Sequence, residues 1–290
     1  MVKSEAYIKM SRRYTQRKAL RVTLKVLALA FIFCLVIAPL VWMIITSFKG
    51  PREMYTTPVN YWPKEPTLEY YEHLLNKDYL LINIWNSVKY SVLAPLMTVV
   101  LATMSSYILT RVKFPGSKLV MMFFIMTQML PGAAAVMTMY MFMARLNLVN
   151  KLSTMIVMSG AGGIPFAILM LQGFVRGVPI DIEEAALIDG CSRWQGFVRI
   201  VVPLLRAGIF TVFIFQFINC WNNTYGAMIY LENSRTQTLP VLIFKLVGKT
   251  DINWGEVAAG TTISLIPTCI LFGLMKNFFV AGITAGAVKG

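Results

Sequence analysis

The sequence predicts an all-α integral membrane protein with six transmembrane helices. Two observations lead to this prediction. Of the 290 residues, 57% are hydrophobic and only 14% are charged, and the mean hydropathy is +0.64. Water-soluble domains carry roughly 25% charged residues. The apolar residues also gather into runs long enough to cross a bilayer, which takes about 20 residues in a helix.

Six such runs occur, and none contains Asp, Glu, Lys or Arg. Lipid admits only helices or closed barrels, because each backbone polar group must be satisfied within the protein. Barrel strands would read as short alternating segments, whereas these runs are continuous. The expected spans are Val26–Ile45, Tyr90–Leu109, Leu119–Ala144, Leu152–Val175, Ala207–Leu231 and Val257–Met275. Pro131 and Pro165 are expected to kink their helices, because proline removes a backbone hydrogen bond.

Lys and Arg predict the orientation. Six spans place both termini on the side of the 110–118 and 176–206 loops, and this side holds 17 of the 27 Lys and Arg residues. Cytoplasmic loops are the ones enriched in these residues, so both termini are expected in the cytoplasm. The expected organisation is a basic arm over residues 1–25, a six-helix transmembrane domain over 26–278 with an external loop at 46–89, and a cytoplasmic tail over 279–290.

The basic arm has two other interpretations, nucleic-acid binding and a signal peptide. A cleaved signal has an apolar core of roughly 7–15 residues, shorter than the first span here, and no small-residue cleavage site follows it. We interpret the arm, and the net charge of +14, as a topology anchor. The partners are therefore expected to include lipid and no nucleic acid.

The sequence argues against an enzyme and against a pump that has its own energy source. The single histidine, His73, cannot form a triad or a His-based metal site, and no pair of the four cysteines has metal-ligand spacing. Gly248-Lys249-Thr250 resembles a phosphate loop, but Ile243 stands where its first glycine is needed. The spans carry no acid or base for ion coupling. We expect no catalytic residue, no metal and no cofactor in this chain.

The 176–206 loop has the pattern of a short surface helix followed by a second amphipathic stretch. Asp181 is an N-cap candidate after Pro179, and acids in the first turn suit the helix dipole. Gly190 is expected to end the helix. Trp194, Phe197 and Ile200 then recur at spacings of three, until Pro203 breaks the stretch. A helix with an acidic edge and two small residues predicts a docking element for another protein.

The residues of this loop resemble a motif of a known protein family. Glu184-Ala185-Ala186, then Gly190, then Ile200 to Pro203 is similar to the EAA loop of membrane subunits of bacterial ABC importers. Val202 replaces a leucine of that pattern. Other short segments resemble the carbohydrate-uptake type, as in the smaller membrane subunit of the maltose importer. They are Ser47-Phe48-Lys49, Trp62 to Tyr70, Asn86-Ser87, Tyr107 with Arg111, Phe114 with Gly116, Ile188-Asp189-Gly190, Trp221-Asn222 and Gly282 to Gly290. At Thr138-Met139-Tyr140 the chain departs from the family, which often has a proline before Leu-Tyr.

The resemblance implies a type I ABC importer permease fold, with a cytoplasmic coupling helix between the fourth and fifth spans, in a bacterial inner membrane. It implies four kinds of partner: a second permease subunit, two cytoplasmic ATPase subunits that bind ATP and magnesium, an external solute-binding protein, and a sugar or oligosaccharide. The residues expected to couple to the ATPase are Glu183, Glu184, Ala185, Ala186, Asp189 and Gly190.

Polar residues in the apolar segments are the candidates for the substrate pathway. Amides beside aromatic rings suit sugar hydroxyls and C–H faces. Interhelical hydrogen bonding and an interfacial position explain such residues equally well. The candidates are Gln128, Gln216, Asn219, Trp221, Asn222, Asn223 and Tyr225.

Two questions stay open at this point. The 46–89 loop, rich in proline and aromatic residues, is either a platform for the binding protein or a cover over helix ends. The solute is either a sugar, neutral or acidic, or another compound such as glycerol phosphate, and a membrane scaffold without transport activity is a further alternative.

Overall fold

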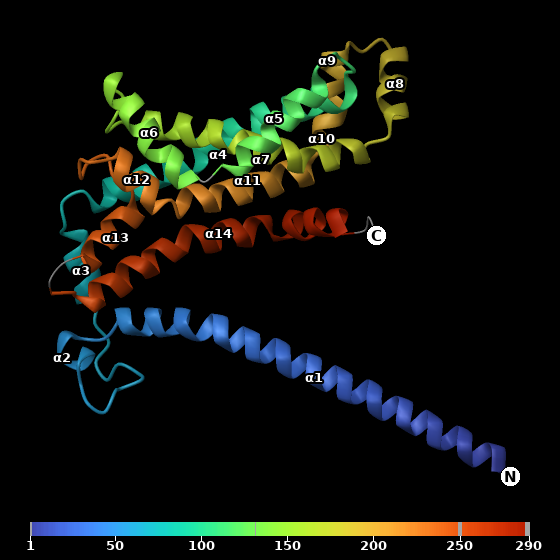
Figure 1. The fold of residues 1–290 in the computed structure, drawn as a ribbon. Coiled ribbons are helices and arrows are strands. Elements are labelled where there is room, and N and C mark those ends of the chain that lie inside the picture. The colour runs from blue at the N-terminus through green and yellow to red at the C-terminus, as the bar shows by residue number, and fades with distance from the viewer. Residues whose placement is uncertain (1, 131, 249–250, 288–290) are drawn as a thin grey trace. The chain divides into compact units, whose positions relative to one another are not determined.

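The computed structural model describes the backbone of residues 2–130, 132–248 and 251–287, and the side chains of residues 20–130, 132, 136–248 and 251–275. Every element in these ranges is helical, as the sequence predicts (Figure 1). The elements are α1 Val2–Ser47, α2 Pro51–Met54, α3 Glu69–Leu75, α4 Leu80–Arg111, α5 Ser117–Met129, α6 Gly132–Arg145, α7 Leu152–Gly177, α8 Ile180–Ile188, α9 Arg193–Gly196, the π-helical turn η1 Phe197–Val201, α10 Val202–Leu204, α11 Arg206–Trp221, α12 Thr224–Tyr230, α13 Leu239–Val247 and α14 Trp254–Ala287.

Among the described residues, four helices are long and apolar enough to cross a membrane: Leu20–Ser47, Leu80–Arg111, Leu152–Gly177 and Trp254–Met275. A fifth candidate is the pair Arg193–Leu204 and Arg206–Trp221, which is bent by 71°. The fourth predicted span agrees closely with α7. The second begins earlier than predicted, at Leu80, and α14 continues into the segment expected to be a tail.

Two predicted spans are not continuous helices. The third divides into α5 and α6, because Leu130 is extended, with φ −74° and ψ 132°; a residue before proline avoids the helical region. Pro131 itself, where a kink was expected, lies outside the described residues. The fifth divides at Asn222, because the Asn223 side chain accepts the Gly226 N–H and begins α12 as a new helix.

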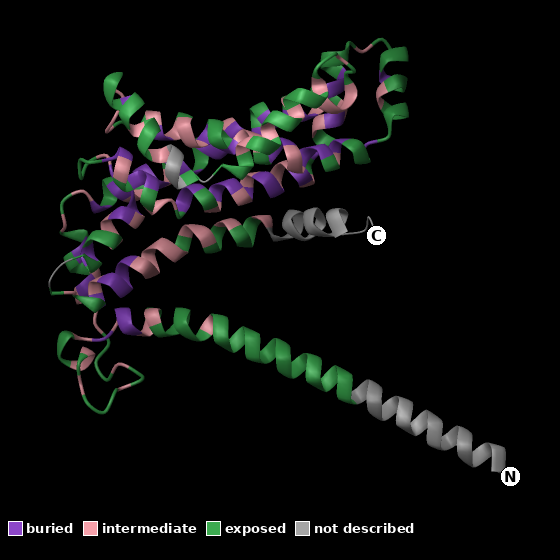
Figure 2. Cartoon of the chain, in the orientation of Figure 1, coloured by how far each residue is buried: buried purple, intermediate pink, exposed green. Residues whose placement is uncertain are grey.

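The chain divides into two compact units. The first is Met1–Glu72 with Trp254–Thr262, and the second is His73–Asn253 with Ile263–Gly290. In the first unit, α1 is exposed along most of its described length (Figure 2). Its end is held by Ser47, which shares a 2.7 Å hydrogen bond with Tyr71, and by Phe48, whose carbonyl accepts the Thr67 N–H at 2.9 Å.

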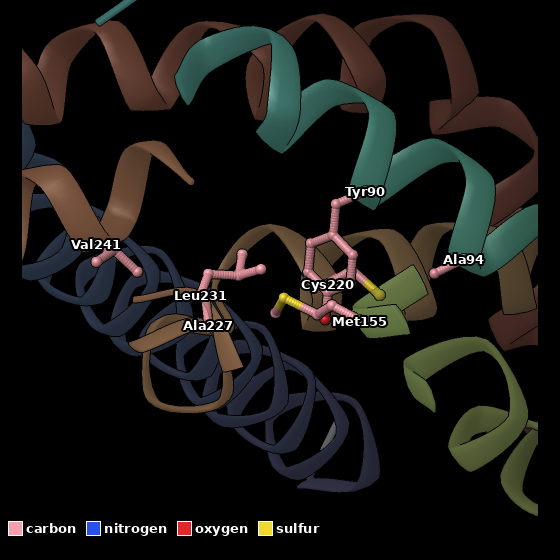
Figure 3. Close-up of a cluster of buried hydrophobic side chains, with 7 residues drawn as sticks. All are labelled: Tyr90, Ala94, Met155, Cys220, Ala227, Leu231 and Val241. Atoms are coloured by element: carbon pink, nitrogen blue, oxygen red, sulfur yellow. The ribbon is translucent and has the colours of Figure 1, made fainter. Parts of the chain in front are cut away.

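The core of the second unit lies where α4, α7 and α11 pack together (Figure 1). One buried cluster joins Val99, Ala102, Ala167, Ile168, Leu171 and Val212. Another joins Tyr90, Ala94, Met155, Cys220, Ala227, Leu231 and Val241 (Figure 3). Small residues allow this close approach: Thr98 Oγ1 donates to the Gly160 carbonyl at 2.8 Å, a contact of the kind that joins helices in membranes.

Buried polar residues near the start of α4 hold the 234–239 segment. Asn86 Nδ2 donates to the carbonyls of Arg235 and Gln237 at 2.9 and 3.1 Å, and Ser87 Oγ accepts the Leu239 N–H at 2.7 Å. This gives the Asn86-Ser87 pair a structural role, because it satisfies backbone groups that would otherwise be buried without partners.

Candidate functional site

The predicted surface helix in the 176–206 loop is α8. It starts two residues earlier than the Asp181 N-cap prediction, because the capping residue is Pro179, whose side chain accepts no hydrogen bond. Its end is as predicted. Gly190 has φ +86°, and the N–H groups of Gly190 and Cys191 donate to the carbonyls of Leu187 and Ala186 at 3.1 and 3.0 Å. Glycine favours this left-handed ending because a Cβ would be strained there.

The second stretch begins with a capping box. Ser192 Oγ accepts the Gln195 N–H at 3.2 Å, and Gln195 Oε1 accepts the Ser192 N–H at 2.8 Å. The helix runs on as the π-helical turn η1 and then as α10, which includes Pro203. The prediction that Pro203 breaks this stretch is therefore wrong. The break comes at Leu205, where the chain turns into α11. Pro203 is tolerated because it lies in the first turn of α10.

Tyr107, Arg111 and Glu183, which we call the latch, join α8 to the end of α4. Arg111 Nε lies 2.7 Å from Glu183 Oε1, and Tyr107 Oη donates to Glu183 Oε2 at 2.9 Å. The Arg111 guanidinium also donates to the carbonyls of Val175 and Val178, at 3.1 and 2.5 Å. Both charged side chains are largely buried, with 15% and 12% exposed. A buried charge pair of this kind is costly to break from one side.

Aromatic contacts reinforce the attachment. The ring centroids of Tyr107 and Phe197 are 4.7 Å apart, and those of Trp194 and Phe197 are 5.6 Å apart. Phe197 belongs to a buried cluster with Val175, Val178, Val201 and Leu205. The two helical stretches of the loop are therefore both fixed to the packed helices rather than only tethered to them.

The six predicted coupling residues divide into two groups. Glu183 is paired with Arg111, and Ala186 is buried, so both serve attachment. The others are exposed: Glu184, Ala185, Asp189 and Gly190. The apolar part of this surface was not predicted from the sequence. Ile188 is 86% exposed, and Leu187 and Trp194 are also exposed. An apolar side chain on a polar loop is the signal that could have identified it.

A second candidate site, which we call the polar cavity, opens between α4, α5, α7 and α11. Its volume is about 400 Å³, and the residues around it are Tyr90, Gln128, Ser159, Gly162, Gly163, Phe166, Gln216, Asn219, Cys220 and Asn223. Small-molecule pockets are typically of roughly 300–1,000 Å³, with a few polar groups among apolar ones. The cavity fits that description.

Hydrogen bonds fix one wall of the polar cavity. Tyr90 Oη lies 2.7 Å from Ser159 Oγ and accepts from Asn223 Nδ2 at 3.0 Å. Asn223 uses its other amide atom to cap α12. The Gln216 side chain lies against α7, because Gly163 leaves room for it: a Cβ at position 163 would overlap Gln216 Nε2.

The structure brings four of the seven predicted pathway residues to this cavity: Gln128, Gln216, Asn219 and Asn223. It places the other three elsewhere. Trp221 is 2% exposed, and its indole N–H donates to Ser264 at 3.2 Å. Asn222 and Tyr225 are exposed outside the cavity lining. Tyr90 and Ser159 were missed, because a single hydroxyl in a long apolar run carries no distinctive pattern.

Clusters of three or more His, Cys, Asp or Glu able to hold a metal do not occur in the described part of the chain. Of the phosphate-loop lookalike, Lys249 and Thr250 lie outside the described residues.

Residues 98–285 match the family of binding-protein-dependent transport system inner membrane components. The chain belongs to this family. It is 32% identical to the diacetylchitobiose uptake system permease protein DasC of Streptomyces coelicolor, over 93% of this chain and 96% of the relative. It is 31% identical to the trehalose/maltose transport system permease protein MalG of Thermococcus litoralis, over 87% of this chain and 91% of the relative.

A solved structure shares the fold. It is a bacterial ABC transporter involved in the import of the acidic polysaccharide alginate, with a TM-score of 0.79 and 18% identity, covering 88% of this chain and 95% of that one. The family membership confirms the resemblance found in the sequence. The chain is a membrane component of an ABC importer, and its relatives named above are sugar permeases.

Proposed function

We propose that this chain is the permease subunit of an ATP-driven importer for a sugar or oligosaccharide, that it forms half of the translocation pathway, and that it couples to a cytoplasmic ATPase through α8. The observation that carries the proposal is the latch. Arg111, at the end of the membrane-length helix α4, forms an ion pair with Glu183, whereas the neighbouring Glu184 is exposed. A helix fixed to a span on one side and open on the other suits the transmission of movement.

The proposed topology keeps six spans with both termini in the cytoplasm of a bacterial cell. In it, α5 and α6 together make the third span, and α11 with α12 makes the fifth. Broken helices are tolerated at membrane depth where they line a cavity or pack within the protein. The excess of Lys and Arg on the side of the 176–206 loop supports this orientation, which makes α8 a cytoplasmic helix between the fourth and fifth spans.

The proposed partners are a second permease subunit, two ATPase subunits and an external solute-binding protein. In this arrangement the ATPase subunits hold ATP and magnesium, and this chain performs no catalysis. Closure of the ATPase pair moves α8, and the latch passes that movement to α4, which carries Arg111, and to α7, whose Val175 carbonyl accepts a hydrogen bond from the Arg111 guanidinium. The cavity then changes the side on which it opens.

A sugar is the solute favoured by two observations. The polar cavity combines amides, hydroxyls and the Phe166 ring, and the relatives named for diacetylchitobiose and for trehalose and maltose cover nearly the full chain. An importer subunit for another solute, such as glycerol phosphate, and a scaffold without transport activity are the alternatives that the experiment below separates.

The test has two parts. The chain is purified from its native operon background, and an ATPase subunit is expected to be recovered with it; Glu184→Lys should release the ATPase. The matched control, Glu65→Lys, makes the same charge change at an exposed residue of the loop predicted to be external, and should retain the ATPase. If both variants retain the ATPase, the proposed coupling surface on α8 is contradicted.

The second part measures uptake in a strain lacking the gene. Transport of at least one saccharide should depend on the chain. If uptake of glycerol phosphate depends on the chain and uptake of every saccharide is independent of it, the proposed solute is wrong and the coupling proposal stands. If the ATPase is absent from the wild-type complex and no solute depends on the chain, the scaffold alternative replaces both.

A further inference from the structure

We propose that the saccharide handled by this chain is uncharged, and that the amides of Gln128 and Asn219 are the groups that bind its hydroxyls. The inference rests on the proposed function, because it assigns the substrate class of the same cavity. It goes further in excluding uronic, sulfonated and phosphorylated saccharides.

The chemistry of the lining favours a neutral ligand. The polar groups around the cavity are amides and hydroxyls, together with one thiol. Within the part of the chain that the structure describes, no Asp, Glu, Lys or Arg side chain reaches the cavity. The sequence extends this observation, since all six apolar runs lack these four residue types. This chain therefore brings no fixed charge to the pathway at the depth of the membrane.

The free-energy cost of dehydration also favours a neutral ligand. A carboxylate or sulfonate that leaves water for a poorly hydrated cavity loses its hydration, and the loss costs several kcal/mol unless a cation pairs with it. Hydrogen bonds from neutral amides recover only part of that loss, since a typical net hydrogen bond contributes about 1 kcal/mol. A neutral sugar hydroxyl loses far less on entry, and one amide can both donate to it and accept from it. The lining thus discriminates by charge.

Two amides of the lining are available to bind a ligand. Tyr90, Ser159 and Asn223 are occupied with one another or with the α12 cap. By contrast, the side chains of Gln128 and Asn219 are exposed and take part in no hydrogen bond with the described residues. They approach the cavity from different helices, α5 and α11, so that two hydroxyls of one ligand can be bound from two directions.

An apolar face completes the site. Phe166 is 40% exposed, and its ring lies edge-on to Phe215 at 6.3 Å between centroids, which holds its orientation. A pyranose ring presents C–H groups on one face and hydroxyls around its edge. Aromatic side chains bury such faces well, and a charged substituent gains nothing from this contact.

The test uses a thiol reporter in the assembled importer in membranes. The four native cysteines are replaced by serine, and Gly162→Cys is introduced, because an added Cβ at this lining residue meets no atom within 4 Å. The rate of labelling by a maleimide is measured with a panel of neutral di- to tetrasaccharides and with a panel of oligouronates of matched length. Neutral saccharides should slow labelling several-fold, and oligouronates should not.

Two controls keep the result interpretable. Gly173→Cys lies on the same helix outside the cavity, also with open space around an added Cβ, and its labelling should not respond to either panel. Asn219→Lys in the Gly162→Cys background adds a cation, and the oligouronates should then protect. If position 162 cannot be labelled or the variant does not assemble, the comparison is made by equilibrium binding of the two panels to the wild-type complex.

The outcomes are separable from those of the proposed function. Protection by oligouronates equal to or better than that by neutral saccharides overturns the inference and leaves a sugar importer. Protection by neither panel also overturns it, because the cavity is then not the saccharide site. Whether the chain transports sugar at all is decided by the uptake assay and not by this labelling.

Discussion

Arg111 and Glu183 form an ion pair of 2.7 Å between the end of α4 and the first turn of α8. The two residues are 72 positions apart in the sequence, and the guanidinium also binds two carbonyls at the end of α7 and just beyond it. One side chain thus joins three segments. Glu183, which the sequence predicts to couple to an ATPase, attaches α8 to the end of α4 in this structure.

Arg111→Ala is expected to uncouple transport from ATP hydrolysis. It leaves the Glu183 carboxylate partly buried without its cation, a loss of about 1.5–3 kcal/mol for a hydrogen bond to a charged group, so α8 loses its fixed position. In proteoliposomes, uptake should fall more than tenfold while ATPase activity persists. Lys113→Ala, which removes an exposed cation two residues later, should change neither. Equal losses of uptake and ATPase activity would indicate misfolding instead.

Gly163→Ala is expected to weaken substrate affinity without unfolding the protein. An added Cβ overlaps the end of the flexible Gln216 side chain, which can move but then enters the polar cavity. The concentration for half-maximal uptake should rise several-fold. Gly173→Ala, on the same helix with open space around the Cβ, should leave it unchanged. Since alanine also favours helix over glycine by about 1 kcal/mol, a stability loss in Gly163→Ala would contradict this interpretation.

Gly208→Ala should destabilise the packed helices. The new Cβ would lie 2.6 Å from the Phe174 ring, which is part of the packing between α7 and α11 and cannot move as a flexible chain end can. Overpacking costs about 1–3 kcal/mol, so the thermal midpoint measured in detergent should fall by several degrees. Gly177→Ala has open space and is the control, for which the midpoint should not fall.

Ile188→Glu should release the ATPase. Ile188 is 86% exposed beside Glu184, and the few residues that dominate an interface each contribute about 2 kcal/mol or more to binding. Recovery of the ATPase with the purified chain should fall more than tenfold. Ile188→Val keeps an apolar group of similar size and should retain it. Equal recovery of the ATPase by both variants would show that α8 docks through its acidic edge alone.

Much of the architecture follows from the sequence because lipid imposes simple rules on it. Long uncharged runs must be helical, which predicts α1, α4, α7 and α14 from composition and length. Gly190 predicts the end of α8, because the backbone there needs a left-handed conformation. The spacing from Glu184 to Pro203 predicts the family, which the match over residues 98–285 confirms.

The helix breaks at Leu130 and Asn222 were less predictable. A run of apolar residues has the same hydropathy pattern whether it forms one helix or two. Whether the helix breaks depends on local interactions of individual residues. The steric effect of a following proline settles the first break, and the side-chain cap by Asn223 settles the second. Both signals were present in the sequence, but continuous hydrophobicity outweighed them in the interpretation.

By itself, the sequence determined the solvent in which this protein folds, the helical class, and the family, because composition and short-range spacing encode these directly. The tertiary structure alone decided the use of each polar side chain. Glu183 attaches α8 because Arg111 meets it, Trp221 holds α11 to Ser264, and Gln128 and Asn219 face a cavity. Whether a polar group is occupied or free depends on partners distant in the sequence, and only folding brings those partners within hydrogen-bond distance.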